Sequence, residues 1–356
     1  MMRILVATDA WHPQINGVVR SLEHTASEAL HLGARLEFLT PQEFRTVPLP
    51  TYDEIRLSLA TPRMIMRRIE AMQPDFVHVA TEGPIGILVR RACIATRRTF
   101  TTSYHTKFPE YLSARAPVPE RLTYAWLRSF HNAGGGVMVA TATLERELEA
   151  RGFKRLMRWS RGVHADLFRP RPEVDLGLPK PVFLFVGRVS VEKNIEAFLS
   201  LDLPGSKAVV GGGPALASLK ARFPDAHFFG PKEGEDLARI YSGSNVFVFP
   251  SRTDTFGIVL LEALASGLPV AAYPVTGPMD VLGEATEPVG VLDEDLRTAC
   301  LKALELSPQA ARDYALRYSW RECAKQFIDN VLIAHDFGPV ARRFRLLRRN
   351  RLISVA

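Results

Sequence analysis

Two acidic residues eight positions apart lie in the segment with the clearest chemical potential, SRTDTFGIVLLEALASGLPV at residues 251–270. Asp254 precedes a helical pattern, and Glu262 lies about two turns into it. The helix start at residues 256–258 leaves backbone N–H groups that can bind hydroxyl or phosphate oxygens. Because its neighbours are almost all apolar or small, Glu262 is predicted to be a buried or cleft-facing acid that needs a partner, rather than part of a solvated helix face. These groups could hold the hydroxyls of a ribose and of a sugar.

Two cations follow the first buried strand of the second half of the chain. In GRVSVEKN at residues 187–194, Arg188 and Lys193 lie five residues apart. At the carboxyl end of a strand, two cations can clamp a diphosphate. A solvated loop with two unrelated charges is the alternative, and the residues alone leave both open.

Glycines mark two further turns. Gly17 in PQINGVVRSL opens a helix after the first strand, where it could approach a phosphate or simply form a turn. VVGGGPALASL at 209–219 suggests a dinucleotide fingerprint, but Leu216 occupies its last glycine position and no acid follows about 20 residues later at a strand end. We therefore interpret it as a tight turn and exclude a nicotinamide site.

Short apolar runs alternate with helical patterns along the whole chain. Runs such as VFLFVG and VFVFP are typical of parallel strands buried on both faces. Nine strands are expected, at 3–8, 76–81, 99–105, 137–141, 182–189, 207–210, 227–230, 246–250 and 270–273. This order predicts an α/β protein with two doubly wound, Rossmann-like domains, whose ligand lies at the carboxyl ends of the strands.

The domain boundary is expected in the proline-rich segment 162–181. The prediction is an N-terminal domain at 1–165, a C-terminal domain at 170–335 and a basic helical tail at 336–356. Three cysteines, Cys93, Cys300 and Cys323, are too few and too widely spaced for a disulfide framework or a zinc site, which favours a reducing, cytoplasmic setting. We expect a first strand, not a signal peptide, at the start of the sequence.

The frame around the two acids resembles that of family 4 retaining glycosyltransferases, which have the GT-B fold of two Rossmann-like domains facing each other across a cleft. Their pattern E-x-F-G-x4-E-A-x-A-x-G-x-P-V stands here from Asp254 to Val270, with aspartate in place of the usual first glutamate. Aspartate is one methylene shorter but keeps the charge, so we expect a retained role. His164 also departs from the usual pattern. Further matches are Gly187-Arg188, Glu192-Lys193-Asn194, Gly211–Pro214, the PQINGVV loop and SYHTKFPEY at 103–111.

The resemblance implies a nucleotide-sugar site made of Gly17, Arg188, Lys193, Lys232, Asp254, Phe256, Gly257, Ile258 and Glu262, with catalytic roles for His105, Arg188, Lys193 and Asp254. In this scheme the two cations neutralise the diphosphate, and Glu262 binds the ribose. Asp254 holds the sugar with the N–H groups of the helix start. Lys232 lies by the base, Gly17 by the diphosphate and sugar, and His105 faces the sugar from the first domain.

The same resemblance implies a retaining transfer without a metal ion. Arg188 and Lys193 would stabilise the charge that develops on the departing diphosphate. No carboxylate is obviously placed as a nucleophile, so retention is expected through an oxocarbenium-like state on one face. Asp293-Glu294-Asp295 is formally a D-x-D metal signature, but it precedes a helical pattern, and we expect its acids to favour that helix's N-terminus. No cofactor besides the nucleotide-sugar substrate is expected.

The last 16 residues, ARRFRLLRRNRLISVA, contain six arginines and no acid, and so carry most of the formal net charge of +7. Val340, Phe344 and Leu347 form an apolar stripe at helical spacing, which favours docking on an anionic membrane over a helix that packs back on the first domain. A cationic segment at 62–72 is a second candidate. No run of about 18 apolar residues could span a bilayer. No nucleic-acid-binding module accompanies the arginines.

Three functions remain open from the sequence. The first is a cytoplasmic, peripheral-membrane glycosyltransferase that uses a UDP-hexose or UDP-hexuronate and a diacylglycerol-type lipid. The second is a GDP-mannose-dependent α-mannosyltransferase that acts on a lipid or a polysaccharide. The third is a non-catalytic sugar-nucleotide-binding protein, for which Asp254 is the one hint.

Overall fold

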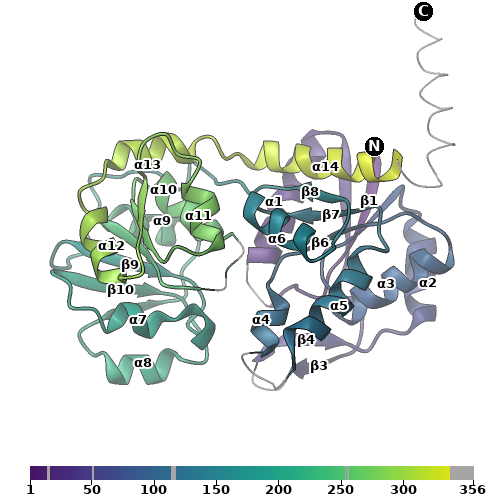
Figure 1. The fold of residues 1–356 in the computed structure, drawn as a ribbon, viewed down its shortest axis with the longest axis horizontal. Helices are drawn as coiled ribbons and strands as arrows, with labels where there is room; N and C mark the ends of the chain where they lie inside the picture. The colour runs from purple at the N-terminus through teal and green to yellow at the C-terminus, as the bar shows by residue number, and fades with distance from the viewer. Residues whose placement is uncertain (14–16, 50–51, 114–117, 253, 255, 337–356) are drawn as a thin grey trace, which may run out of the picture. The chain divides into compact units, whose positions relative to one another are not determined.

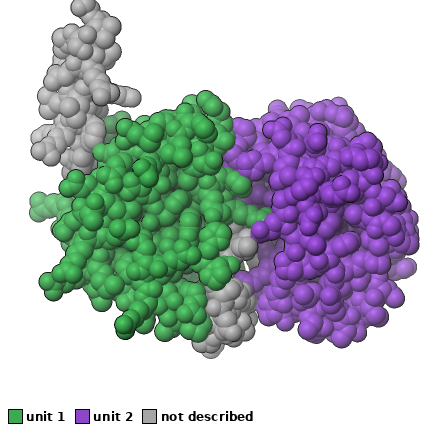
Figure 2. Space-filling model, turned by 180° about the vertical axis from the view of Figure 1, so that it is seen from behind, with its two compact units in different colours: residues 1–160, 321–356 green, residues 161–320 purple. Residues whose placement is uncertain are grey.

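The computed structural model describes residues 1–13, 17–49, 52–113, 118–252, 254 and 256–336 (Figure 1). The chain forms two compact units, one of residues 1–160 with the segment that starts at Arg321, and one of Arg161–Trp320 (Figure 2). Each unit is a parallel sheet flanked by helices, as the alternating sequence pattern predicts.

The sheet of the first unit has the strand order β2-β1-β5-β6-β7-β8, with all pairs parallel. Its strands are β1 Met2–Ala7, β2 Ala34–Leu39, β5 Phe76–Val79, β6 Thr101–Ser103, β7 Gly136–Val139 and β8 Leu156–Arg158. A small antiparallel hairpin, β3 Thr46–Leu49 and β4 Tyr52–Ser58, lies outside this sheet.

The helices of the first unit cover both faces of its sheet. They are α1 Gly17–His31, α2 Pro62–Met72, α3 Pro84–Ala95, α4 Phe108–Ser113, α5 Glu120–His131 and α6 Ala142–Ala150, with the short η1 Pro41–Glu43. Alternate strand residues face opposite sides, so Leu5 and Val77 pack with α2 and α3 in one buried cluster. His78, next to Val77, faces the other side.

The second unit repeats this plan with the strand order β11-β10-β9-β12-β13-β14, again entirely parallel. Its strands are β9 Val182–Val186, β10 Ser206–Val210, β11 His227–Gly230, β12 Val246–Phe249, β13 Val270–Ala272 and β14 Gly290–Leu292. Its helices are η2 Val191–Lys193, α7 Ile195–Leu199, α8 Leu216–Arg222, α9 Gly234–Ser242, α10 Ile258–Ala265, α11 Thr276–Leu282, α12 Leu296–Ala303 and α13 Pro308–Ala315.

The last described helix, α14 Trp320–Asp336, starts in the second unit and packs on the first from Arg321 onward. Phe327 is fully buried, and its ring contacts the rings of His78 and Trp159. The sequence-based division differs here, because it assigned residues up to 335 to the second domain. An amphipathic pattern shows that a helix has a buried face, but it does not show which core covers that face.

No helix in the described part of the chain combines the length and apolar character needed to cross a membrane. Of the predicted basic tail, residues 336–356, only Asp336 is described, as the last residue of α14; residues 337–356 lie outside the described residues.

Candidate functional site

Four segments that carry motif matches or predicted site residues follow four adjacent parallel strands of the second unit. Residues 187–194 follow β9, 211–214 follow β10, 230–232 follow β11, and the segment from Ser251 follows β12. Because parallel strands end at the same edge of a sheet, these segments share the carboxyl edge of this sheet, where open α/β sheets bind ligands. The structure thus brings together the predicted residues of the second unit along one edge.

Lys193 and Asp254, which are 61 residues apart in sequence, form an ion pair at this edge. The Lys193 ammonium donates to both carboxylate oxygens of Asp254, at 2.6 and 2.8 Å. Both side chains are about three-quarters buried, with 25% and 23% of their surface exposed. In this structure Asp254 is thus the counter-ion of Lys193, the cation that the sequence predicts to bind a phosphate.

Asn194, the residue after Lys193, ties the same loop to the end of β12. It adopts a left-handed backbone conformation (φ +52°) between η2 and α7. Its side-chain amide donates to the Pro250 carbonyl at 3.1 Å. The loop that carries Arg188 and Lys193 is thus held against the segment that carries Asp254.

The glycines at 211–213 support this loop from the other side. Gly211 has φ +140°, and a Cβ atom there would lie 1.8 Å from the carbonyl oxygen of Gly187. The Val189 N–H donates to the Gly212 carbonyl at 2.9 Å. The close approach of two backbones explains why glycine is needed, and it confirms the predicted tight turn.

Helix α10 begins at Ile258, the last of the three residues expected at its start, so Glu262 lies just over one turn into the helix instead of about two. Gly257 is the N-cap residue, with φ +82°, and Ile258 is the first helical residue. Phe256 is buried beside it. The first N–H groups of such a helix have no carbonyl partner within the helix, so this end can accept a hydroxyl or phosphate oxygen.

Glu262 lies inside α10 and is buried, with 5% of its surface exposed. Its carboxylate accepts a hydrogen bond of 2.9 Å from the hydroxyl of Tyr241 on α9. The Tyr241 ring is fully buried and packs edge-on against Phe168. The sequence predicts that this acid needs a partner; Tyr241 is one, and no motif around it pointed to that role.

Lys232 follows the turn at Gly230, which has φ +71°. Its ammonium lies 3.8 Å from the Asp236 carboxylate, one helical turn further along the chain. This distance makes a weak, partly exposed pair that a ligand can replace. The structure places Lys232 at the predicted edge, and its contact with a base stays a prediction.

Two predicted residues belong to the first unit. Gly17 is the first residue of α1, and its carbonyl accepts a hydrogen bond of 2.6 Å from the Ser21 hydroxyl. The three residues before it lie outside the described residues. His105 follows β6 at the carboxyl edge of the first sheet, and its ring contacts that of Trp159 at a centroid distance of 5.7 Å.

The loop after His105 is held by two polar contacts. The Lys107 ammonium donates to Glu147 on α6 at 2.7 Å, and the Tyr124 hydroxyl on α5 donates to Glu110 at 2.6 Å. Burial alone would raise the pKa of Glu147, but hydrogen bonds from Lys107 and Arg151 outweigh it and hold that pKa below its ordinary value. The segment that follows the residue predicted to contact the sugar is therefore held against α5 and α6.

Two buried histidines flank β6, and sequence reasoning did not single them out. His78 is bonded to the hydroxyls of Thr101 and Ser103 at 2.8 and 2.9 Å, and burial lowers its pKa to about 3. His131 is bonded to Thr102 at 2.8 Å and to Glu82 at 3.0 Å. The sequence signal that could have indicated them is the run TTS in β6, because buried hydroxyls on both faces of a strand need polar partners.

The Asp293-Glu294-Asp295 segment caps a helix, as expected. Asp295 is the N-cap of α12 and accepts from the Arg297 N–H at 3.1 Å. Asp293 accepts from the Asp295 N–H at 3.0 Å. Glu294 lies 3.2 Å from the guanidinium of Arg252.

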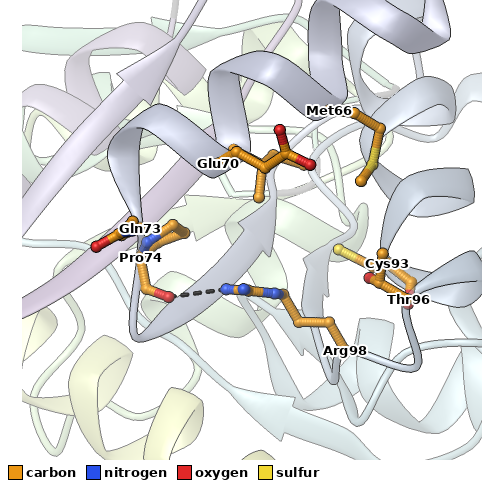
Figure 3. Close-up of a pocket in the computed structure, with 8 residues that line it drawn as sticks. Met66, Glu70, Gln73, Pro74, Cys93, Thr96 and Arg98 are labelled. Carbon is orange, nitrogen blue, oxygen red and sulfur yellow. Dashed lines mark hydrogen bonds between the residues drawn. The ribbon is translucent and has the colours of Figure 1, made fainter.

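A cavity of about 440 Å³ lies elsewhere, beside the carboxyl-terminal ends of α2 and α3 in the first unit (Figure 3). Arg98 donates to the Pro74 carbonyl there at 2.8 Å. Burial raises the pKa of the Cys93 thiol to about 12, so it stays protonated and unreactive. Helices in these units run opposite to the strands, so the carboxyl-terminal ends of the helices lie near the amino-terminal ends of the strands. The cavity is therefore not at the carboxyl edge of a sheet, where the predicted site residues lie.

The two units define the class of protein. Two Rossmann-like units in one chain, with the motif segments at the carboxyl edge of one sheet, are the GT-B fold of glycosyltransferases. Two solved structures share it: sucrose-phosphate synthase from Thermosynechococcus elongatus has a TM-score of 0.70 at 19% identity, covering 98% of this chain and 100% of that one. HepE of Anabaena, in complex with UDP and glucose, has a TM-score of 0.69 at 14% identity, covering 92% and 99%.

Family comparisons agree with this class. Residues 15–167 match the model described as Glycosyltransferase Family 4, and residues 170–295 match that of Glycosyl transferases group 1. A GDP-mannose-dependent alpha-mannosyltransferase of Mycobacterium tuberculosis is 31% identical over 318 residues, covering 79% of this chain and 81% of the relative. The chain belongs to glycosyltransferase family 4.

Two further relatives are a sulfoquinovosyl transferase and a synthase whose name includes a diacylglycerol lipid. Sulfoquinovosyl transferase SQD2 of Arabidopsis thaliana is 32% identical over 327 residues, covering 79% of this chain; the match spans 62% of that relative's length. Alpha-monoglucosyldiacylglycerol synthase of Streptococcus pneumoniae is 24% identical over 356 residues, covering 86% of this chain and 79% of the relative.

Proposed function

We propose that this glycosyltransferase moves a hexose or hexuronate from a UDP-sugar to a diacylglycerol-type membrane lipid, with retention of the anomeric configuration. The observation that carries the proposal is the Lys193–Asp254 ion pair beside the start of α10, at the sheet edge shared with Arg188 and Glu262. Similarity to the alpha-monoglucosyldiacylglycerol synthase of Streptococcus pneumoniae, whose name includes a diacylglycerol lipid, supports the lipid acceptor.

In the proposed mechanism, the donor's diphosphate takes the place of the Asp254 carboxylate at Lys193. Asp254 then accepts hydrogen bonds from sugar hydroxyls, and Glu262 accepts them from the ribose. When the bond between the anomeric carbon and the phosphate oxygen breaks, its electrons stay on the diphosphate, where Arg188 and Lys193 stabilise the charge. The acceptor hydroxyl attacks the same face and gives its proton to the departing phosphate oxygen.

This scheme assigns no step to a metal ion, since two cationic side chains neutralise the diphosphate. His105 lies in the first unit, and its contact with the sugar remains part of the proposal. Its test is His105→Asn, which should lower turnover more than donor affinity if the imidazole acts on the reacting sugar.

The experiment that tests the proposal measures turnover of UDP-hexoses, UDP-hexuronates and GDP-mannose with extracted lipid, with mass spectrometry of the products. A glycosylated diacylglycerol formed from a UDP-sugar is the expected result. Turnover with GDP-mannose alone would identify the second candidate. Donor binding without turnover in any combination would instead indicate a non-catalytic sugar-nucleotide-binding protein.

The second candidate, a GDP-mannose-dependent α-mannosyltransferase acting on a lipid or a polysaccharide, is favoured by one specific observation. The M. tuberculosis relative of that name is matched over 81% of its length, whereas the sulfoquinovosyl transferase is matched over 62%. The match thus covers more of the mannosyltransferase than of the sulfoquinovosyl transferase, although the two sequence identities are similar.

We further propose that the protein works as a peripheral protein on the cytoplasmic face of the membrane and that the arginine-rich tail docks on anionic lipid. Replacing its six arginines by glutamine should abolish most binding to anionic vesicles, and added salt should weaken binding of the native chain. If that variant sediments with the vesicles as the native chain does at low salt, the tail does not dock on the membrane. The second candidate segment then is α2, which exposes Arg63, Met64 and Arg67.

A further inference from the structure

The outer faces of α3 and α5 carry a distinct mixture of arginine and apolar side chains. On α3, Ile87, Arg90, Arg91 and Ile94 follow the spacing that places residues on one helix face. Ile94 is 48% exposed and Arg91 is also exposed, while Ile87 and Arg90 are half-buried. Ile87 packs against the buried cluster of the first unit, so Arg91 and Ile94 are the members of this face that water can reach.

The corresponding face of α5 has the same spacing. Leu122, Ala125, Trp126 and Ser129 lie along it, and all four are exposed. Leu122 and Trp126 are the large apolar members, with 58% and 43% of their surface exposed. Trp126 is the most exposed of the four tryptophans, since Trp159 and Trp320 are buried and Trp11 is half-buried.

The two faces form one continuous surface. The Arg90 guanidinium donates to the carbonyls of Ser129 and Phe130, both at 3.0 Å, and lies over the Phe130 ring. Trp126 packs against that same ring at a centroid distance of 5.8 Å. Figure 1 shows α5 and α3 as neighbouring helices on the first unit, with α2 beyond them. We call Arg90, Arg91, Ile94, Leu122 and Trp126 the α3–α5 surface.

The charge of this surface is one-sided. Helix α3 contains two arginines and no acid, and α5 contains Arg121 and Arg128 against the single acid Glu120. Glu120 already accepts a hydrogen bond of 3.1 Å from the Ser113 hydroxyl. Exposed arginines with one exposed tryptophan and branched apolar side chains suit the boundary between anionic headgroups and acyl chains, where tryptophan prefers to lie.

We propose that the α3–α5 surface docks the first unit on an anionic lipid bilayer, in addition to the tail. This inference deepens the proposed lipid-acceptor function and rests on it. Arg91 contacts the headgroup phosphates, Arg90 holds α3 against α5, and Leu122, Trp126 and Ile94 enter the interfacial layer. The surface belongs to two helices packed on the first unit, so it would orient the enzyme on the membrane.

The test uses the full chain with its six tail arginines replaced by glutamine, so that only the body of the protein can bind. Vesicles contain equal parts of phosphatidylglycerol and phosphatidylcholine. Tryptophan fluorescence should shift to the blue on binding and should be quenched by brominated acyl chains. Trp126→Phe should abolish the shift, whereas the control Trp11→Phe should retain it.

Matched substitutions test each contribution to affinity. Arg91→Gln should weaken vesicle binding about fivefold, whereas the control Arg321→Gln removes the same charge from an exposed position on α14 and should change it much less. Ile94→Ser should also weaken binding about fivefold, against little change for Ile333→Ser, whose native side chain is 46% exposed on α14. Equal losses in variants and controls, or equal shifts in the two tryptophan variants, would overturn the proposal.

A protein occupant would give a different result. If the chain forms a dimer without vesicles, and Leu122→Ser with Trp126→Ser abolishes it, this surface joins two copies and the bilayer proposal is wrong. Sedimentation velocity measures this directly.

A second assay separates this inference from the proposed function. With the lipid acceptor dispersed in non-ionic detergent, Arg91→Gln and Ile94→Ser should turn over like the parent chain, while both should lose rate on vesicles. If no lipid is glycosylated even in detergent, the proposed acceptor class is wrong, whatever the fluorescence shows. If detergent turnover is normal and vesicle rates are unchanged in the variants, the acceptor class stands and the docking surface is wrong.

Discussion

Replacing Glu262 by glutamine should weaken the donor without unfolding the second unit. The carboxylate is 5% exposed and accepts from Tyr241 at 2.9 Å. Glutamine has nearly the same shape and still offers a carbonyl oxygen to that hydroxyl, so the native packing can persist. What it loses is the negative charge that would accept the ribose hydroxyls.

The magnitude follows from the kind of hydrogen bond. A hydrogen bond to a charged group contributes about 1.5–3 kcal/mol. Losing one such contribution from donor binding corresponds to roughly a ten- to hundredfold increase in the donor KM and in the Kd for UDP. Steady-state kinetics at saturating acceptor give the first value, and calorimetric titration with UDP gives the second.

Tyr241→Phe is the control that separates binding from folding. It removes the hydroxyl donor and leaves the buried carboxylate less satisfied, so the second unit should lose about 1–3 kcal/mol of unfolding free energy. If Glu262→Gln leaves donor KM, UDP affinity and turnover unchanged while Tyr241→Phe lowers stability, the carboxylate is a structural partner of the tyrosine and the ribose assignment is wrong.

Three further predictions concern the phosphate site, the glycine turn and acid stability. Arg188→Ala and Lys193→Ala should each lower kcat by orders of magnitude in folded protein, and EDTA should leave the native rate unchanged; loss in EDTA with rescue by Mg²⁺ or Mn²⁺ would contradict this. Gly211→Ala should lower both turnover and the melting temperature because its Cβ would lie 1.8 Å from the Gly187 oxygen, whereas Gly177→Ala, with φ +67° and nothing within 4 Å, should cost only backbone strain. Burial lowers the pKa of His78 to about 3 and that of His335 to about 4, from 6.5. The unfolded chain therefore binds protons that the folded chain does not, and the first unit should lose stability as pH falls from 6.5 toward these values, by at most about 1.4 kcal/mol per pH unit for each histidine. Urea unfolding of His335→Phe at a series of pH values should show a shallower loss of stability as pH falls. An unchanged slope would show that His335 does not contribute to the loss of stability in acid.

The segment from Asp254 to Glu262 was predictable because its chemistry is local. A buried strand, a loop and a helix follow one another, so residue order alone sets which groups reach the carboxyl edge. To predict the Lys193–Asp254 contact, one must also know that β9 pairs with β12, and the sequence pattern does not specify this pairing. Tyr241 could not be named, because the burial of Glu262 demands a donor without indicating which helix supplies it.

All nine expected strands are present, and those that sequence reasoning missed are mainly edge strands. In β2, Arg35 and Glu37 interrupt the apolar pattern, because one side of this edge strand is accessible to water. Arg3 of β1 forms an ion pair of 3.0 Å with Glu37 across the two strands. Strands β8 and β14 end the two sheets and are only partly buried, so they lack the fully buried pattern of β6 and β13, which are equally short.

The Lys193–Asp254 pair also explains how an aspartate can occupy a position where glutamate is usual. With the shorter side chain, both carboxylate oxygens still reach the ammonium, at 2.6 and 2.8 Å. Because each side chain keeps about a quarter of its surface exposed, the pair is only partly desolvated, and the cost of separating the two charges is moderate. A diphosphate carries more negative charge than a carboxylate, so it competes well for Lys193. In the proposed mechanism the ion pair thus keeps the cation in place before the donor arrives, and its exchange leaves Asp254 beside the start of α10, where a sugar hydroxyl can take the position of the ammonium.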